Sequence, residues 1–305
     1  MSNIVNSAWL AERIMNKGIN NSAITSLHHN PDSEFKLGSE AYSDLIVVDC
    51  RFVLGQPNAG REAYTAGHIP EAVYMDLEQD LSGVKKEHGG RHPLPDLGAF
   101  ALKLGKLGMD EKVSIVAYDD QGGAMAARFW WMLHFLGHAK VHILDGGFAQ
   151  WKAAGYEVSE MSPTHVEPRT FKPNVNRHLL LSIDEVKQKL GQDNTILIDS
   201  REKPRYLGLE EPIDAVAGHI PGAINAFWKE SLNGDGLWKN AEEQRERFAD
   251  IQPDKELIVY CGSGVTACPN FVALKEAGFN NVKLYSGSWS DWISYVDNPI
   301  AKGEE

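Results

Sequence analysis

Short apolar runs rich in β-branched residues alternate along the chain with longer segments of helical periodicity. Four such runs lie at residues 45–48, 114–118, 195–198 and 257–260. Runs of this length and composition predict buried strands. Strands that alternate with helices predict βαβ units, in which helices cover a parallel sheet on both faces. The pattern therefore predicts an α/β fold.

Two helical segments carry additional signals. Ser182 and Glu185 form a predicted capping box, and Gly191 is the expected stop of the helix that follows. Residues 124–136 are apolar nearly all round and rich in aromatic side chains, which predicts a buried helix rather than a cofactor site. We expect part of this helix to pack against the second half of the chain.

The same motifs occur twice in the same order. Residues 45–51 correspond to residues 195–201, and the sequence Ala-Gly-His-Ile-Pro at 66–70 recurs at 217–221. A period of roughly 150 residues is too long for a solenoid, whose units span about 20 to 50 residues. It indicates a duplicated domain.

A chain of 305 residues is long enough for two domains of ordinary size. The segment at 160–168 is polar and interrupted by prolines, which is typical of a linker. We therefore expect a first domain at residues 1–160, a linker at 161–177 and a second domain at 178–305, with the two domains being parallel sheets flanked by helices.

In the segment at 257–269, a cysteine lies between a predicted strand and a predicted helix. Cys261 is the first residue of the glycine-spaced loop Cys-Gly-Ser-Gly-Val-Thr. The backbone N–H groups of such a loop, with the positive end of the following helix, form an anion cradle that stabilises a thiolate. The alternative for an isolated cysteine is a buried structural thiol. Gly262 and Gly264 favour the chemical role, because they permit the tight backbone path.

The spacing disfavours three other cysteine chemistries. A tyrosine-phosphatase type of loop needs an arginine six positions after the cysteine as a phosphate clamp, and that position is Ala267. Cys261 and Cys268 are too far apart for a Cys-x-x-Cys redox site, and the loop does not match the papain-like signature.

The two copies differ at the decisive position. The first copy has Asp119 where the second has Cys261, and Asp120 follows it. Two carboxylates repel an anionic substrate, so we expect the first domain to be catalytically inactive. Cys50 is interpreted as a structural thiol. Cys268 is either inert or able to form a disulfide or polysulfide with Cys261 under oxidation.

Residues 261–267 resemble the active-site loop of the rhodanese superfamily, and their form is similar to that of the 3-mercaptopyruvate sulfurtransferases. Thiosulfate sulfurtransferases of the superfamily carry basic residues where this chain has Gly262 and Ser263, so the neutral loop disfavours a small dianion as donor. The resemblance implies two tandem rhodanese-like domains with the site at their interface, and an inactive N-terminal domain.

The resemblance also implies the chemistry. Sulfane sulfur would move from 3-mercaptopyruvate, releasing pyruvate, to cyanide or a thiol acceptor such as a reduced protein thiol, through a persulfide on Cys261. The backbone N–H groups expected to hold the anionic sulfur are those of Gly262, Ser263, Gly264, Val265 and Thr266. Ser263 would also donate to the thiolate or relay a proton, although both loop hydroxyls can instead bond the turn backbone.

Two arginines and one histidine match further family positions. Arg201 and Arg205 match the arginines that hold the substrate carboxylate, and a planar guanidinium suits that task because it can donate two hydrogen bonds. His68 matches a position proposed to assist proton transfer, but its acidic partner has no clear counterpart. Because His68 recurs as His219, a structural role in both turns is the simpler alternative.

Charge and composition limit the partners and the location. A net charge of −12 argues against nucleic acid and acidic membranes. The three cysteines give no disulfide framework, which fits a reducing compartment. No secretory signal is visible, and no apolar run approaches the length of about 20 residues that a membrane span needs. We therefore expect a cytoplasmic protein. The stretch at 88–95 lacks zinc-like ligand spacing and is interpreted as an interdomain loop from which Arg91 could reach the site. We expect neither a metal nor a cofactor.

Three alternatives to a mercaptopyruvate-using enzyme remain open. One is an enzyme that prefers thiosulfate, and another is a relay protein that carries persulfide between partners. The third is a non-catalytic rhodanese-like binding module, which the intact Cys261 loop disfavours.

Overall fold

The computed structural model describes residues 2–16, 45–163 and 166–304 and contains two five-stranded sheets. The strands of the first sheet are β1 (Ile4–Val5), β2 (Leu45–Asp49), β3 (Val73–Tyr74), β4 (Ser114–Tyr118) and β5 (Val141–Leu144). Their spatial order is β1-β5-β4-β2-β3, and every pair in this sheet is parallel.

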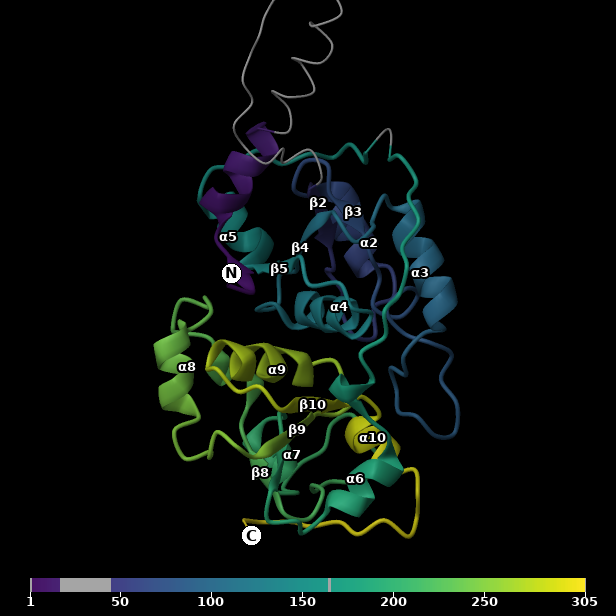
Figure 1. Ribbon diagram of the computed structural model, residues 1–305, viewed down its shortest axis with the longest axis vertical. Helices are drawn as coiled ribbons and strands as arrows, with labels where there is room; N and C mark the ends of the chain where they lie inside the picture. Colours follow the sequence, from purple (N-terminus) through teal and green to yellow (C-terminus); the bar gives the residue numbers. More distant parts are fainter. Residues whose placement is uncertain (1, 17–44, 164–165, 305) are drawn as a thin grey trace, which may run out of the picture.

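The second sheet repeats this topology. Its strands are β6 (Leu180–Leu181), β7 (Thr195–Asp199), β8 (Ala223–Asn225), β9 (Glu256–Tyr260) and β10 (Val282–Tyr285). Their order is β6-β10-β9-β7-β8, again with parallel pairing throughout. The predicted α/β fold with a duplicated parallel sheet is confirmed, and Figure 1 shows the two sheets as separate layers.

Helices cover both faces of each sheet. In the first domain these are residues 7–16, α2 (Ala59–Ala66), α3 (Leu97–Lys106), α4 (Ala124–Phe135) and α5 (Gly147–Ala153). The second domain contributes η1 (Arg177–Leu179), α6 (Ile183–Lys189), α7 (Lys203–Tyr206), η2 (Trp228–Ser231), α8 (Ala241–Arg247), α9 (Ala267–Glu276) and α10 (Ser288–Trp292). Val47 and Val48 are neighbours on β2 yet belong to different hydrophobic clusters, because successive side chains of a strand point to opposite faces.

The predicted helix signals are confirmed. Ser182 accepts a hydrogen bond from the backbone N–H of Glu185, and the Glu185 carboxylate accepts one from the backbone of Ser182. Gly191, with φ +70°, follows the end of α6. All residues of α4 except His134 are buried, as expected for a helix that is apolar nearly all round.

The two domains meet along α4 and α9, which lie side by side between the sheets (Figure 1). The rings of Trp130 and Phe271 are 6.2 Å apart, and one continuous hydrophobic cluster includes residues of both helices. The predicted packing of this helix against the second half of the chain is confirmed. The domain boundaries at residues 160 and 178 remain predictions.

Candidate functional site

The loop that follows β9 holds Cys261 at the carboxyl edge of the second sheet. The residue is 1% exposed, and its Sγ accepts a hydrogen bond from the backbone N–H of Gly264 at 3.2 Å. Gly264 has φ +76°, and a Cβ there would lie 2.2 Å from the carbonyl oxygen of Ser286. Glycine is therefore required for the backbone path that turns this N–H toward the sulfur.

A serine at the start of α10 also contacts the cysteine. The Ser288 hydroxyl oxygen accepts a hydrogen bond from the backbone N–H of Cys261 at 3.1 Å and lies 4.0 Å from Sγ. Ser288 has φ +58°, whereas the corresponding position in the first copy is Gly147 with φ +54°. A non-glycine residue in the left-handed region is strained, and such strain tends to occur at functional sites. The loop motif alone did not indicate this residue.

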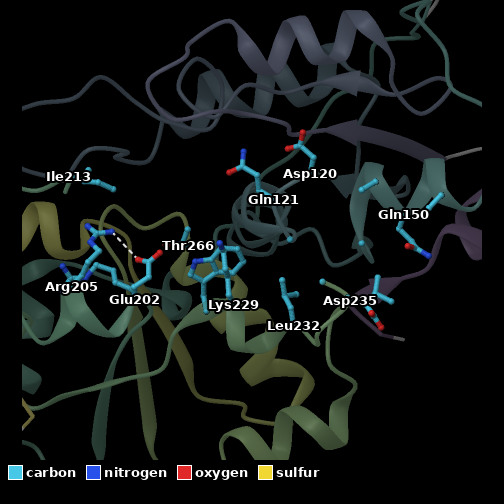
Figure 2. A pocket seen from close by; sticks show the side chains of 18 residues that line it. Asp120, Gln121, Gln150, Glu202, Arg205, Ile213, Lys229, Leu232, Asp235 and Thr266 are labelled. Carbon is cyan, nitrogen blue, oxygen red and sulfur yellow. Dashed lines mark ion pairs between the residues drawn. The ribbon is translucent and has the colours of Figure 1, made fainter. Parts of the chain in front are cut away.

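Two cavities border the cysteine loop. The smaller has a volume of about 110 Å³ and is bounded by loop residues and by residues of the first domain. Its lining includes Phe52, Leu77, Arg91, His92, Met125, Gly262, Ser263, Val265 and Thr266. The larger, about 770 Å³, is shown in Figure 2 and shares Arg205, Ile213 and Thr266 with it. Both cavities lie between the domains.

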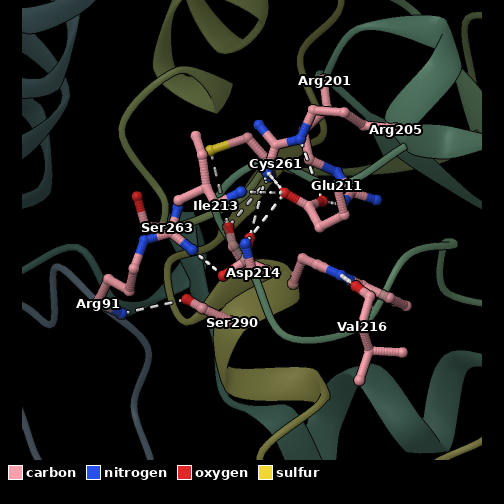
Figure 3. A network of polar contacts seen from close by, with 12 residues as sticks. Arg91, Arg201, Arg205, Glu211, Ile213, Asp214, Val216, Cys261, Ser263 and Ser290 are labelled. Carbon is pink, nitrogen blue, oxygen red and sulfur yellow. Dashed lines mark hydrogen bonds and ion pairs between the residues drawn. The ribbon is translucent and has the colours of Figure 1, made fainter. Parts of the chain in front are cut away.

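Two arginines converge on the loop from different domains (Figure 3). Arg91, from the first domain, forms an ion pair with Asp214, and Arg205 lies 2.6 Å from Glu211 and 3.2 Å from Asp214. A Cβ at Gly262 would be 2.8 Å from Arg91 Nη2 and 3.5 Å from Arg205 Nη2. The missing side chain at position 262 thus leaves room for two guanidinium groups.

Arg201 has different surroundings, although it also lines the larger cavity. Its side chain is 1% exposed, with paired hydrogen bonds to Asp199, one to the carbonyl of Gly218 at 2.6 Å and one to Glu211 at 3.2 Å. Arg51 makes the matching contacts with Asp49 and with the carbonyl of Gly67 in the first copy. This duplication favours a structural role for Arg201, and its direct binding of substrate remains a prediction.

The hydroxyl of Ser263 is hydrogen-bonded to a histidine of the first domain. His92 Nδ1 lies 2.8 Å from Ser263 Oγ, and both residues are buried. Burial and the nearby Arg128 charge lower the pKa of His92 to about 4. The ring is therefore neutral at neutral pH and can exchange a proton with the hydroxyl. Sequence reasoning named the segment and Arg91 but missed His92, because the pairing joins residues 171 positions apart.

His68 lies among backbone carbonyls rather than at the cavities. Its ring is 0% exposed and stacked on Tyr64, with Nδ1 2.7 Å from the Tyr64 carbonyl and Nε2 3.2 Å from that of Met161. His219 stacks in the same way on Tyr206. Neither histidine lines the two cavities. These contacts favour the structural alternative, and the role of His68 in proton transfer remains a prediction without geometric support.

The matching loop of the first domain is filled by its own carboxylate. Asp119 accepts hydrogen bonds from the backbone N–H groups of Gln121, Gly123, Met125 and Ala126 at 2.8 to 3.0 Å. Burial raises the pKa of Asp119, while these four donors act in the opposite direction. The donors that would hold a substrate anion therefore bind the protein's own side chain, in keeping with the prediction of an inactive first domain.

The other two cysteines lie in the interior. Burial raises the pKa of Cys50 well above its ordinary value and that of Cys268 to about 12. Cys268 donates to the carbonyl of Gly264 at 3.4 Å. Both are therefore protonated at neutral pH, which favours structural roles. The oxidative role considered for Cys268 remains a hypothesis.

Among the residues that the structure describes, no three histidine, cysteine, aspartate or glutamate side chains are grouped so as to hold a metal ion. None of the described helices combines the length and apolar character of a membrane span.

Comparisons with known proteins agree with this geometry. A family model for the rhodanese-like domain matches residues 33–154 and again residues 182–295. A probable 3-mercaptopyruvate sulfurtransferase of Pseudomonas aeruginosa is 46% identical over 266 residues, which cover 86% of this chain and 93% of the relative. A thiosulfate sulfurtransferase of Bos taurus is 36% identical over 256 residues, which cover 82% of this chain and 85% of the relative.

A solved 3-mercaptopyruvate sulfotransferase structure from Escherichia coli has a TM-score of 0.75 and 31% identity, covering 95% of this chain and all of the other. The two family matches fall on the two parallel sheets, and each includes one of the corresponding loops, with Asp119 in the first and Cys261 in the second. The chain therefore belongs to the rhodanese family, with two rhodanese-like domains in tandem.

Proposed function

We propose that this protein is a sulfurtransferase that takes the sulfur atom of 3-mercaptopyruvate and passes it, as the sulfane sulfur of a Cys261 persulfide, to cyanide or a thiol acceptor. The observation that carries the proposal is the 3.2 Å hydrogen bond from the Gly264 N–H to Cys261 Sγ, in a loop that borders a small cavity with two arginines. The relatives named as 3-mercaptopyruvate sulfurtransferases support the choice of donor.

The reaction has two half-steps that need no external oxidant. The Cys261 thiolate attacks the donor sulfur, so that an S–S bond forms while the donor C–S bond breaks. The electron pair of that bond passes to carbon, which takes up a proton and leaves as pyruvate. The acceptor then attacks the outer sulfur and releases the Cys261 thiolate. Two easier steps thus replace one difficult step.

The loop stabilises the anionic sulfur in both half-steps. We assign this role to the N–H groups of residues 262–266, as an oxyanion hole acts on oxygen. Only the Gly264 N–H lies against Sγ in the described structure. Gly262, Ser263, Val265 and Thr266 border the cavity, and we assign the outer sulfur of the persulfide to their side of the loop.

Donor binding is assigned to the arginines that face the cavity. Arg205 and Arg91 both line it, and a carboxylate in the space above Gly262 would meet both guanidinium groups. Arg201 is assigned a supporting role, because Glu211 accepts hydrogen bonds from both Arg201 and Arg205. A cavity of about 110 Å³ suits a donor as small as mercaptopyruvate.

Proton transfer is assigned to the pair Ser263 and His92. The neutral imidazole and the hydroxyl, 2.8 Å apart, can pass a proton to the departing pyruvate carbon or take one from an incoming thiol. This assignment replaces His68 with a histidine that lines the cavity.

A cytoplasmic location is part of the proposal. All three cysteines are free thiols in the structure, and free thiols persist in a reducing compartment.

The test is thiocyanate formation by the purified protein from mercaptopyruvate and cyanide. Cys261→Ser should abolish turnover, whereas Cys50→Ala, which removes another buried thiol, should leave turnover intact at temperatures where the variant is folded. Incubation with mercaptopyruvate alone should add the mass of one sulfur to the wild-type protein and none to Cys261→Ser. Unchanged turnover in Cys261→Ser would exclude this mechanism.

The same assay separates the alternatives. A strong preference for thiosulfate would favour the thiosulfate sulfurtransferase, to which the relative from Bos taurus points. A protein that is loaded by a partner persulfide but not by either small donor would be a relay protein.

A further inference from the structure

Arg128 is a cation of the first domain that is buried behind the cysteine loop of the second. It lies on α4 and is 0% exposed. Its Nη1 donates to the carbonyl of Gly264 at 3.0 Å, and its Nη2 donates to the carbonyls of His92 at 3.2 Å and Leu81 at 3.3 Å. One guanidinium thus joins the loop of Cys261 to the segment that carries His92.

The charge of Arg128 has no carboxylate partner. Within the described part of the chain, no acidic side chain lies within ion-pair distance of it, and its Nε has no hydrogen-bond partner. Burial lowers the pKa of Arg128. Arg91 and Arg205, on the cavity side, are each paired with a carboxylate. Burying an unpaired cation is costly, so its retention suggests a function.

The corresponding position of the second copy is not an arginine. Arg128 lies nine positions after Asp119, and the residue nine positions after Cys261 is Asn270. The neutral Asn270 donates to Ser200 and to the carbonyl of Ala226. The cation therefore occurs in the copy whose own loop already holds a carboxylate, and it contacts the loop of the other copy.

We propose that Arg128 is a positioning residue for sulfur transfer, which holds Gly264 in place and supplies positive charge to the anionic sulfur of Cys261. Its bond to the Gly264 carbonyl restrains the residue whose N–H faces Sγ. Its charge stabilises the anionic sulfur that attacks the donor and the anionic sulfur that is released to the acceptor. This inference rests on the proposed function, and it gives the inactive first domain a role in catalysis.

The experiment compares variants that remove or keep the charge. Arg128→Met removes it, and Arg128→Lys keeps it. Arg247→Met is the matched control, because Arg247 is also a largely buried arginine, which donates to the side chain of Asn270 and to the carbonyl of Phe227, away from the cysteine loop. Its Nε also lies 3.8 Å from the exposed carboxylate of Glu230. The rate of Cys261 alkylation by iodoacetamide is measured by peptide mass spectrometry, alongside kcat and KM. Iodoacetamide is neutral, so charge does not attract the reagent itself.

Arg128→Met should lower both the alkylation rate and kcat on the order of tenfold, with a smaller change in KM. Arg128→Lys should recover most of the alkylation rate, which a purely structural role would not predict. Arg247→Met should lower Tm but leave both rates unchanged. If Arg128→Met does not fold, the neutral variant Arg128→Gln carries the same expectation.

A folded neutral variant that is alkylated at the wild-type rate would overturn the inference, and so would equal losses in Arg128→Lys and Arg128→Met. These outcomes leave the proposed function standing. Wild-type protein in which Cys261 is inert, or turnover that survives Cys261→Ser, would instead refute the proposed function.

Discussion

Replacing Gly262 with alanine should weaken donor binding while leaving the fold intact. The new Cβ would lie 2.8 Å from Arg91 Nη2, where ordinary contacts begin at 3.4 Å, so the guanidinium must retreat by roughly 0.6 Å. That atom is the end of a flexible side chain, and Gly262 does not need a positive φ. The cost therefore falls on the position of Arg91 and not on the backbone.

The magnitude follows from the hydrogen bonds at stake. A hydrogen bond to a charged group contributes about 1.5 to 3 kcal/mol. Displacing one of two guanidinium groups without removing it should cost about 1 kcal/mol, which corresponds to roughly a fivefold loss in kcat/KM. Because the loss is in binding, the assay of thiocyanate formation at varied mercaptopyruvate concentration should give a higher KM and an unchanged kcat.

Two comparisons make this prediction specific. In an Arg91→Ala background, Gly262→Ala should have little further effect, because the obstructed group is gone. Gly264→Ala, two positions along the same loop, should instead lower Tm, because the new Cβ would lie 2.2 Å from a backbone oxygen at φ +76°. The reasoning is refuted if Gly262→Ala raises KM equally in both backgrounds, or if it lowers kcat alone.

Two further predictions concern charge and pH. Asp214 is paired with Arg91 and Arg205 and so competes with the donor carboxylate for them. Asp214→Asn should therefore lower the KM for mercaptopyruvate severalfold. A higher KM would mean that Asp214 chiefly orients the two arginines. The folded-state pKa of His92 is lowered to about 4, so the unfolded chain binds the proton more readily, and stability should fall as pH drops from about 6.5 to 4. The lowered pKa of His92 contributes about 3 kcal/mol to the free energy of unfolding at neutral pH. The lowered pKa of His134 acts in the same direction. Urea unfolding at pH 7 and pH 5 measures this loss of stability. If the free energy of unfolding of His92→Asn depended on pH as strongly as that of the wild type, His92 would not be the group responsible.

Local sequence was sufficient for much of this protein. The strands at 257–260 and 195–198, the capping box at Ser182 and the buried helix at 124–136 were predicted because period, caps and glycines act within a few residues. The duplication was visible for the same reason, since each copy repeats its own local pattern. The loop of Cys261 was recognisable because its glycines and its cysteine are contiguous in the chain.

Tertiary structure alone decided which distant groups surround that loop. His92 and Arg128 reach it from the first domain, and no local pattern indicates a contact between segments more than a hundred residues apart. Sequence reasoning also treated Arg201 and Arg205 as equivalent, whereas burial and the pairing with Asp199 separate them. The nucleophile was determined locally, by its own turn. Its charge and proton partners depend on domain packing, because electrostatic and hydrogen-bonding environments are set by proximity in space and not by order in the chain.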